Sequence, residues 1–147
     1  MAAPYRRLGL MIAINSVIMF LLTYALIDTI DHFYANVNRV YMAVIMVSGM
    51  LVPMLLLMWS MYPNRAVNGV LLVGSAAVFA VTFYLARAQV PIGNEQFLVS
   101  MIPHHSSAIL MCERSAITDP EIVELCAKIV KAQKEEIAQM KTILRRY

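Results

Sequence analysis

The stretch VYMAVIMVSGMLVPMLLLMWS, residues 40–60, contains no charged side chain and decides the fold class of this protein. About 20 helical residues, at a rise of about 1.5 Å each, span a hydrocarbon core of about 30 Å. Residues 8–27 and 69–86 form two further runs of similar length that also lack charge. We therefore expect an integral membrane protein that crosses the lipid bilayer three times.

The composition agrees with this expectation, because 61% of the residues are hydrophobic, well above the share in an ordinary soluble domain. We expect a membrane domain over residues 1–90, with spans at about residues 8–30, 40–61 and 69–88. Arg6 and Arg7 precede the first span and Arg65 lies in the second loop. The positive-inside rule then predicts a cytoplasmic N-terminus, with the first loop and the C-terminal tail outside the cytoplasm.

The tail, residues 94–147, differs sharply from the rest in charge. It carries fourteen of the 21 charged residues, seven acidic and seven basic, and is therefore neutral overall. Helical periodicity over residues 95–116 and 120–146 predicts two helices, and Thr118 and Pro120 fit the N-cap and first turn of the second. Pro103 predicts a kink or a helix start within the first. The tail offers no basic surface for nucleic acid.

A two-helix hairpin of this length buries little apolar surface alone, and such units usually need a metal, a disulfide or a partner. Two hairpins side by side would make a four-helix bundle. We therefore expect an all-α protein, in which three transmembrane helices carry an extracytoplasmic hairpin domain over residues 94–147. The hairpin is expected to pair in a homodimer or higher homo-oligomer.

Both cysteines lie in the expected hairpin. Cys112 precedes Asp119 by seven residues and Cys126 follows it by seven, so a turn near residue 119 would place the two thiols opposite one another. A disulfide requires Cα atoms closer than about 7 Å and an oxidising compartment. A disulfide, a pair of reduced buried thiols and metal ligation all stay open at this stage.

The sequence SMIPHHSSAILMC, residues 100–112, contains two of the three histidines in the chain. Along a helix Met101 and His105 share one row, while His104 and Met111 share the neighbouring row. Imidazole and thioether ligands together suit copper, Cu(I) above all. Methionine at helical spacing also fills cores, so these residues alone favour a metal site and simple packing about equally.

The segments FLVSMIPHHSSAILM, DP and AKIVKAQKEEIAQM together resemble a ferritin-like bacterial family that was long catalogued as a domain of unknown function. The resemblance covers about residues 94–147, and its hallmark is MIPHH. It implies a helical bundle, anchored at the bacterial inner membrane with the domain in the periplasm, that binds copper as Cu(I) or Cu(II). Residues at the matching positions are the implied ligands: Met101, His104, His105, Met111, Gln133, Glu136 and Met140. Cys112 and Cys126 stand where small residues are common in the family.

Two other groups are weaker candidates for metal binding. Met46 and Met50 belong to a series of methionines four residues apart in the second span, which resembles the thioether track of eukaryotic copper-uptake channels. Asp28, Asp31 and His32 would share one face at the end of the first span and form an accessory site. Lipid-facing packing for the methionines and a solvated cluster for the polar trio are the simpler interpretations.

Enzyme activity is not expected. Neither His104 nor His105 has a Glu three residues before it, as a ferritin-type di-iron centre requires. The expected function is therefore binding, buffering or handover of copper, or of silver, together with a copper-handling partner protein. An oligomeric Cu(I) channel built on the second span, and a structural or signalling membrane subunit, are the alternatives.

Overall fold

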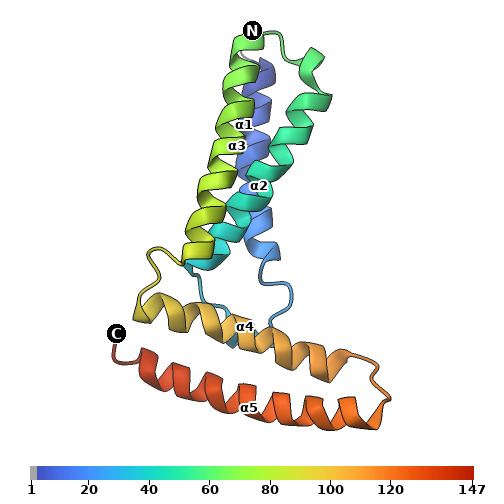
Figure 1. Cartoon of the computed structure of the whole chain (residues 1–147), viewed down its shortest axis with the longest axis vertical. Coiled ribbons are helices and arrows are strands. Elements are labelled where there is room, and N and C mark those ends of the chain that lie inside the picture. Colours follow the sequence, from blue (N-terminus) through green and yellow to red (C-terminus); the bar gives the residue numbers. More distant parts are fainter. Residues whose placement is uncertain (1–2) are drawn as a thin grey trace. The chain divides into compact units, whose positions relative to one another are not determined.

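The computed structural model describes residues 3–147, and its regular structure is helical throughout that range, with no strand (Figure 1). Helices α1 (Ala3–Leu22), α2 (Val37–Leu57) and α3 (Arg65–Ala88) are each long and apolar enough to cross a membrane. Helices α4 (Asn94–Arg114) and α5 (Pro120–Leu144) follow, and single 3-10 turns lie at η1 (Ile30–His32) and η2 (Trp59–Met61). The all-α class and the three apolar spans are confirmed.

Contacts within the chain divide it into two units, which we describe separately. The first contains the three spans, residues 3–23 and 38–90. The second contains α4 and α5, residues 91–147, together with residues 24–37, which we call the connecting loop. The connecting loop joins α1 to α2 in the chain, yet its tertiary contacts are with the hairpin.

The observed bounds of the spans differ from the predicted ones. The first helix ends at Leu22 and not near residue 30, because the chain turns at Thr23, whose hydroxyl donates to the Phe20 carbonyl at 2.6 Å. The second helix ends at Leu57, before η2. The third begins earlier than predicted, at Arg65, since the Asn64 side chain caps it by accepting from the backbone N–H groups of Ala66 and Val67.

In the first unit, a buried polar network ties one end of the spans together. Asn68 is fully buried, and its Oδ1 accepts from the Tyr5 hydroxyl at 2.9 Å. Its amide donates to the carbonyls of Trp59 and Tyr62. Each polar atom of this side chain therefore has a partner, as a group held away from water requires. The aliphatic side chains elsewhere on the spans are largely exposed, as lipid-facing residues are.

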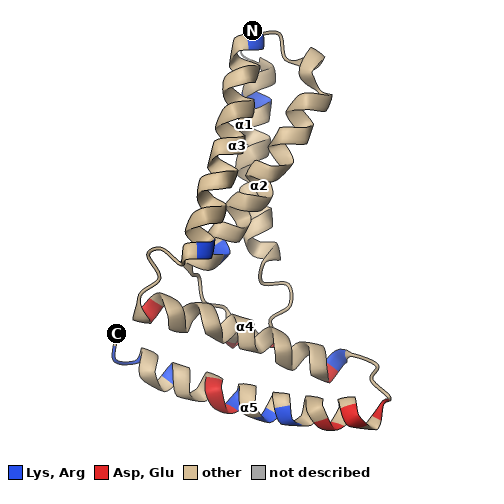
Figure 2. Cartoon of the chain, viewed as in Figure 1, with Lys and Arg blue, Asp and Glu red and all other residues tan. Residues whose placement is uncertain are grey.

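In the second unit, α4 and α5 run antiparallel beside each other (Figure 1). Figure 2 shows that both acidic and basic residues are spread along α5, whereas the three spans carry few charged residues. The core between the two helices is aliphatic. Its buried members are Leu98, Ile102, Ile109, Ile137 and Met140. Two of them, Ile102 and Ile109, have no exposed surface at all.

Two local expectations for the hairpin are corrected by the structure. Asp119, not Thr118, is the N-cap of α5, since its Oδ1 accepts from the N–H groups of the first turn at 2.9 and 3.3 Å. Helix α4 begins at Asn94 and continues through Pro103, so no helix start lies at Pro103. The apolar side chains of α5 are buried only in its second half, and Ile122 and Leu125 stay 47% and 55% exposed.

Candidate metal centre

Three sides of α4 have different surroundings, and this fixes the positions of the histidines. Successive helical residues turn by about 100°. Leu98, Ile102, His105 and Ile109 therefore face α5, and the core confirms this for the aliphatic members. Val99 and Ser106 face the connecting loop. The third side carries Phe97, His104 and Met111, which are all exposed, and we call it the open side.

On the loop side, Ser106 is fully buried and anchors the connecting loop. Its Oγ accepts from the Asp28 N–H at 2.8 Å and lies 2.9 Å from His32 Nδ1. Burial is the main cause that lowers the pKa of His32 below its ordinary 6.5, and the Lys141 ammonium lowers it further. Because His32 is therefore neutral at pH 7, we infer that the Ser106 hydroxyl donates its proton to Nδ1.

Further contacts attach the same loop along α4. The Asn36 amide donates to the Val99 carbonyl at 3.3 Å, and the Val37 N–H donates to Gln96 Oε1 at 3.1 Å. Asn36 is itself buried. The loop thus satisfies buried polar groups on the helix that carries the two adjacent histidines.

The proposed accessory trio in this loop has separate partners. Asp31 forms an ion pair with Lys141 of α5, and the Lys141 side chain lowers the pKa of that carboxyl. His32 contacts Ser106, and Asp28 contributes its backbone N–H to the same hydroxyl. The structure therefore gives Asp31 and His32 structural contacts, and it does not direct the three side chains toward one point.

His105 contacts a carboxylate from the partner helix. Its Nδ1 lies 3.0 Å from Glu136 Oε2, although the two are not aligned as a hydrogen bond, and the ring is 13% exposed. The Gln133 amide donates to the same Glu136 oxygen at 3.4 Å. The structure therefore places Glu136 of α5 against His105, with Gln133 beside Glu136.

This contact determines which nitrogen of His105 is available. Burial lowers the pKa of His105 more strongly than Glu136 raises it, and His104 adds to the lowering, so the imidazole is neutral at pH 7. A carboxylate beside Nδ1 favours the proton on that nitrogen, which leaves Nε2 with a free lone pair. Metal-binding histidines commonly have this carboxylate arrangement.

The adjacent histidines point in different directions, as helical geometry predicts. Their ring centroids are 6.1 Å apart and the rings are inclined by 57°. His104 is exposed on the open side, whereas His105 faces α5. One chain alone thus presents the two imidazoles to different surroundings.

The candidate methionines divide in the same way. Met140 is buried in the hairpin core, and Met101 packs against that core. Met111 is 60% exposed on the open side, in the same row as His104. Across residues 3–147, no group of three or more His, Cys, Asp or Glu side chains is placed to hold one ion.

Cys112 and Cys126 are joined by a disulfide with a Cα–Cα distance of 5.3 Å. This outcome selects one of the three states that the sequence left open. It follows from the hairpin geometry, since the two residues lie equally far from the turn. As disulfide sulfurs, they are not thiolate ligands in this structure.

The methionines of the second span are placed away from the hollow between the spans. Met50 is 38% exposed and Met46 is half-buried. The hollow is lined by side chains such as Ile12, Ser48 and Ser75, and methionine is not among its lining residues in the described chain. The structure of a single chain therefore offers no thioether pathway there.

Sequence reasoning missed the contacts of the connecting loop. Ser106 follows the two histidines directly and looks like a surface residue, yet it is fully buried. A polar loop between two spans also gives no sign of which helix it will contact. The one available signal was a third histidine, His32, in that loop.

Comparison with known proteins finds a family that matches the two helices of the second unit. The family described as "Domain of unknown function (DUF305)" matches residues 81–144, which include all of α4 and α5. A relative, the uncharacterized protein L153 of Acanthamoeba polyphaga mimivirus, is 32% identical over 119 residues, covering 80% of this chain and 76% of the viral protein. The chain belongs to the DUF305 family. No solved structure matches the chain.

The DUF305 match extends further toward the N-terminus than the resemblance drawn from the MIPHH segment, because it begins inside α3. The viral relative covers more of the chain than the hairpin alone, since the hairpin and its preceding residues could not supply 119 aligned positions. Similarity to this relative therefore includes part of the membrane-spanning unit.

Proposed function

We propose that this protein binds a soft metal ion, most readily Cu(I) or Ag(I), at the histidines and methionines of α4. The observation that carries the proposal is His105. Its ring is neutral, mostly buried and backed by Glu136 at 3.0 Å, so that Nε2 is free to coordinate. Met101 lies one helical turn before it, and thioether and imidazole donors together suit copper better than Mg or Ca.

The open side of the hairpin supports a second part of the proposal, pairing of two copies in a ferritin-like four-helix bundle. Phe97 and Met111 of α4 are 52% and 60% exposed. Helical geometry places Leu125 of α5, at 55% exposed, on the same side, away from the connecting loop. Burying these apolar side chains against a second hairpin would enclose His104 and bring in the partner's donors.

The disulfide and the charges support the proposed compartment. A disulfide between Cys112 and Cys126 persists in oxidising compartments, which favours a hairpin outside the cytoplasm. Arg6, Arg7 and Arg65 favour the opposite, cytoplasmic side for the ends of the spans that they flank. We propose a protein of the cell membrane that binds the ion on the extracytoplasmic face and buffers it or passes it to a partner protein.

Binding is a better description than catalysis. The pair of Ser106 and His32 has the atoms of a nucleophile and its base, at 2.9 Å. A nucleophile must reach substrate, however, and Ser106 has no exposed surface. The pair is therefore assigned to holding the connecting loop.

The test uses the full chain in detergent with the disulfide intact, titrated with Cu(I) against a competing chelator. We expect one class of tight site, weakened at least about tenfold, or about 1.4 kcal/mol, by His105→Ala. Met111→Ala and His104→Ala should weaken binding together with loss of the dimer. Met42→Ala, a comparably exposed methionine at 49%, is the matched control.

The outcomes separate the alternatives. Absence of tight binding, or binding unchanged in His104→Ala and His105→Ala, rejects the metal proposal. Copper flux into vesicles that is lost in Met46→Ala and Met50→Ala, but kept in both histidine variants, favours the channel. Monomers at all concentrations reject the four-helix bundle alone.

A further inference from the structure

The two cysteines lie at the end of the hairpin where the aliphatic core has stopped. The last fully buried core residue of α4 is Ile109, before Cys112. On α5, the residues flanking Cys126 are open to solvent, with Val123 48% and Leu125 55% exposed. At this end the helices are connected by the disulfide and by the Lys134–Glu113 ion pair at 2.8 Å, and not by a buried core.

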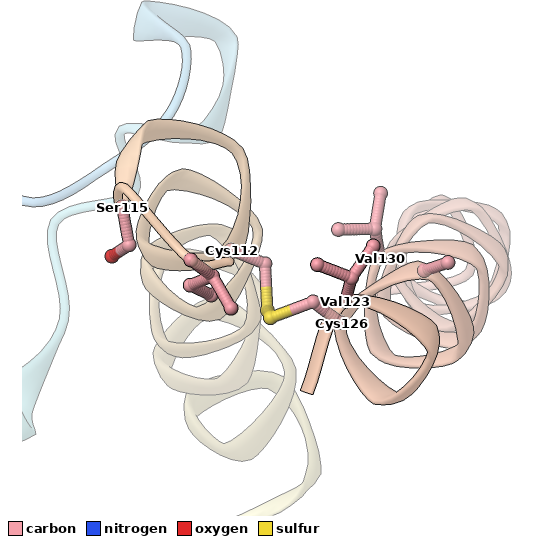
Figure 3. A pocket seen from close by; sticks show the side chains of 7 residues that line it. Cys112, Ser115, Val123, Cys126 and Val130 are labelled. Carbon is pink, nitrogen blue, oxygen red and sulfur yellow. A yellow bond between two sulfur atoms is a disulfide. The ribbon is translucent and has the colours of Figure 1, made fainter. Parts of the chain in front are cut away.

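Both cysteines line a hollow of about 500 Å³ on the surface of the hairpin. Figure 3 shows the disulfide crossing from α4 to α5, with Val123 and Val130 beside Cys126. Ser115 is the polar side chain in the lining, and no charged residue lines the hollow in the described chain. A small reagent or ion can therefore reach the sulfurs, in surroundings that are otherwise apolar.

We propose that Cys112 and Cys126 are a reducible pair whose dithiol form is a second soft-metal site, distinct from the histidine site. In the first step a dithiol reductant delivers two electrons and two protons. The S–S bond breaks, both cysteines become thiols, and the reductant becomes a disulfide. In the second step a monovalent soft cation binds both sulfurs and two protons leave to solvent.

The geometry keeps the two ligands together after reduction. The Cα atoms are 5.3 Å apart, the helices are joined by the short segment after Arg114, and the aliphatic core holds the rest of the hairpin. Both thiolates therefore stay within reach of one ion without new folding. Thiolate is the softest protein ligand and selects Cu(I), whereas the oxidised pair has no thiolate to offer.

The consequence is redox control of binding capacity. Under oxidising conditions the disulfide fixes the end of the hairpin and the histidine site acts alone. Under reducing conditions the same chain gains a second site of different ligand type. This inference does not rest on the proposed function, because it needs neither His104 nor His105.

The test compares stoichiometry in the two redox states, with the full chain in detergent and Ag(I) or Cu(I) as the probe. The protein is reduced with a phosphine, which leaves no competing thiol, and is desalted without oxygen. We expect the reduced chain to bind one more ion than the oxidised chain. The bound ion should protect both cysteines from alkylation by iodoacetamide.

Variants make each outcome decisive. Cys126→Ser and Cys112→Ser should abolish the increment, with helicity by circular dichroism as the check on folding. His104→Ala plus His105→Ala should keep the increment while losing the other site, so failure of either proposal is seen separately. Equal stoichiometry in both redox states, or a disulfide that the phosphine reduces only after unfolding, overturns the proposal.

Discussion

The two ends of the hairpin are held together by different means. Near the start of α4 and the end of α5, Leu98, Ile102, Ile137 and Met140 form an aliphatic core. Near the turn, one covalent bond between Cys112 and Cys126 takes the place of that core. A close-packed core is sensitive to changes in side-chain volume, but it does not depend on redox conditions. A disulfide, in contrast, can be formed by oxidation and broken by reduction.

His105 lies within the packed part of α4, between the core residues Ile102 and Ile109. Cys112 follows Ile109 and begins the cross-linked end. The connecting loop contacts the side of α4 that carries Ser106, where the Asp28 N–H donates to the Ser106 hydroxyl.

The largest effect should come from breaking the packed end. Ile102→Ala removes a side chain with no exposed surface and should cost about 2–5 kcal/mol of unfolding free energy. Thermal or denaturant unfolding of the full chain in detergent, followed by hydrogen exchange in α4 and α5, measures the loss. Ile122→Ala, at a site 47% exposed, is the control and should change stability by less than about 1 kcal/mol.

The next effect comes from removing the cross-link. Cys112→Ser plus Cys126→Ser opens a loop with a sequence separation of 14, for which chain entropy predicts a loss of about 3 kcal/mol. Hydrogen exchange should rise mainly in residues 110–126 and less around Ile102 and Ile137. Equal loss of protection at both ends would contradict the division between them.

The sequence predicted the general organisation well because the features that determine it are patterns of neighbouring residues along the chain. Apolar runs of about 20 residues specify the spans, and Asp119 with Pro120 marks a helix start even though the cap itself was misplaced. Equal spacing about the turn brought Cys112 and Cys126 face to face. Each of these inferences depends on local order along the chain.

The contacts that the sequence did not predict are those between distant segments. Ser106 and His32 are 74 residues apart, and Asp31 and Lys141 are 110 apart. No periodicity connects such pairs, because each depends on how a loop folds back in three dimensions. The same limit applies to Glu136, which the family resemblance implied as a ligand without predicting its contact with His105.

A smaller effect should follow from releasing the connecting loop. Ser106→Ala removes the acceptor of the Asp28 N–H and the donor to His32, which costs about 1–3 kcal/mol for a buried group left unpaired. Faster hydrogen exchange at the Asp28 amide, with α4 otherwise protected, is the expected measurement. Ser107→Ala is the matched control, since that hydroxyl bonds only to the Pro103 carbonyl within the same helix.

The smallest effect is a dependence of hairpin stability on acid. The pKa values of His32 and His105 are both lowered from 6.5, chiefly by burial, so the folded state binds fewer protons than the unfolded state. The free energy of unfolding is then at its maximum above pH 6.5. It falls as the pH drops from 6.5 through the lowered pKa values that the two histidines have in the folded state. Unfolding of the full chain measured between about pH 7.5 and 5 should show this slope, and His32→Gln plus His105→Gln should flatten it. His32 of the connecting loop contacts Ser106 of α4, and His105 contacts Glu136 of α5. The single variants therefore measure how much each histidine contributes to the pH dependence. An increase in the free energy of unfolding on acidification would show instead that the Asp31 and Glu136 carboxylates raise the pKa values of His32 and His105 more than burial lowers them.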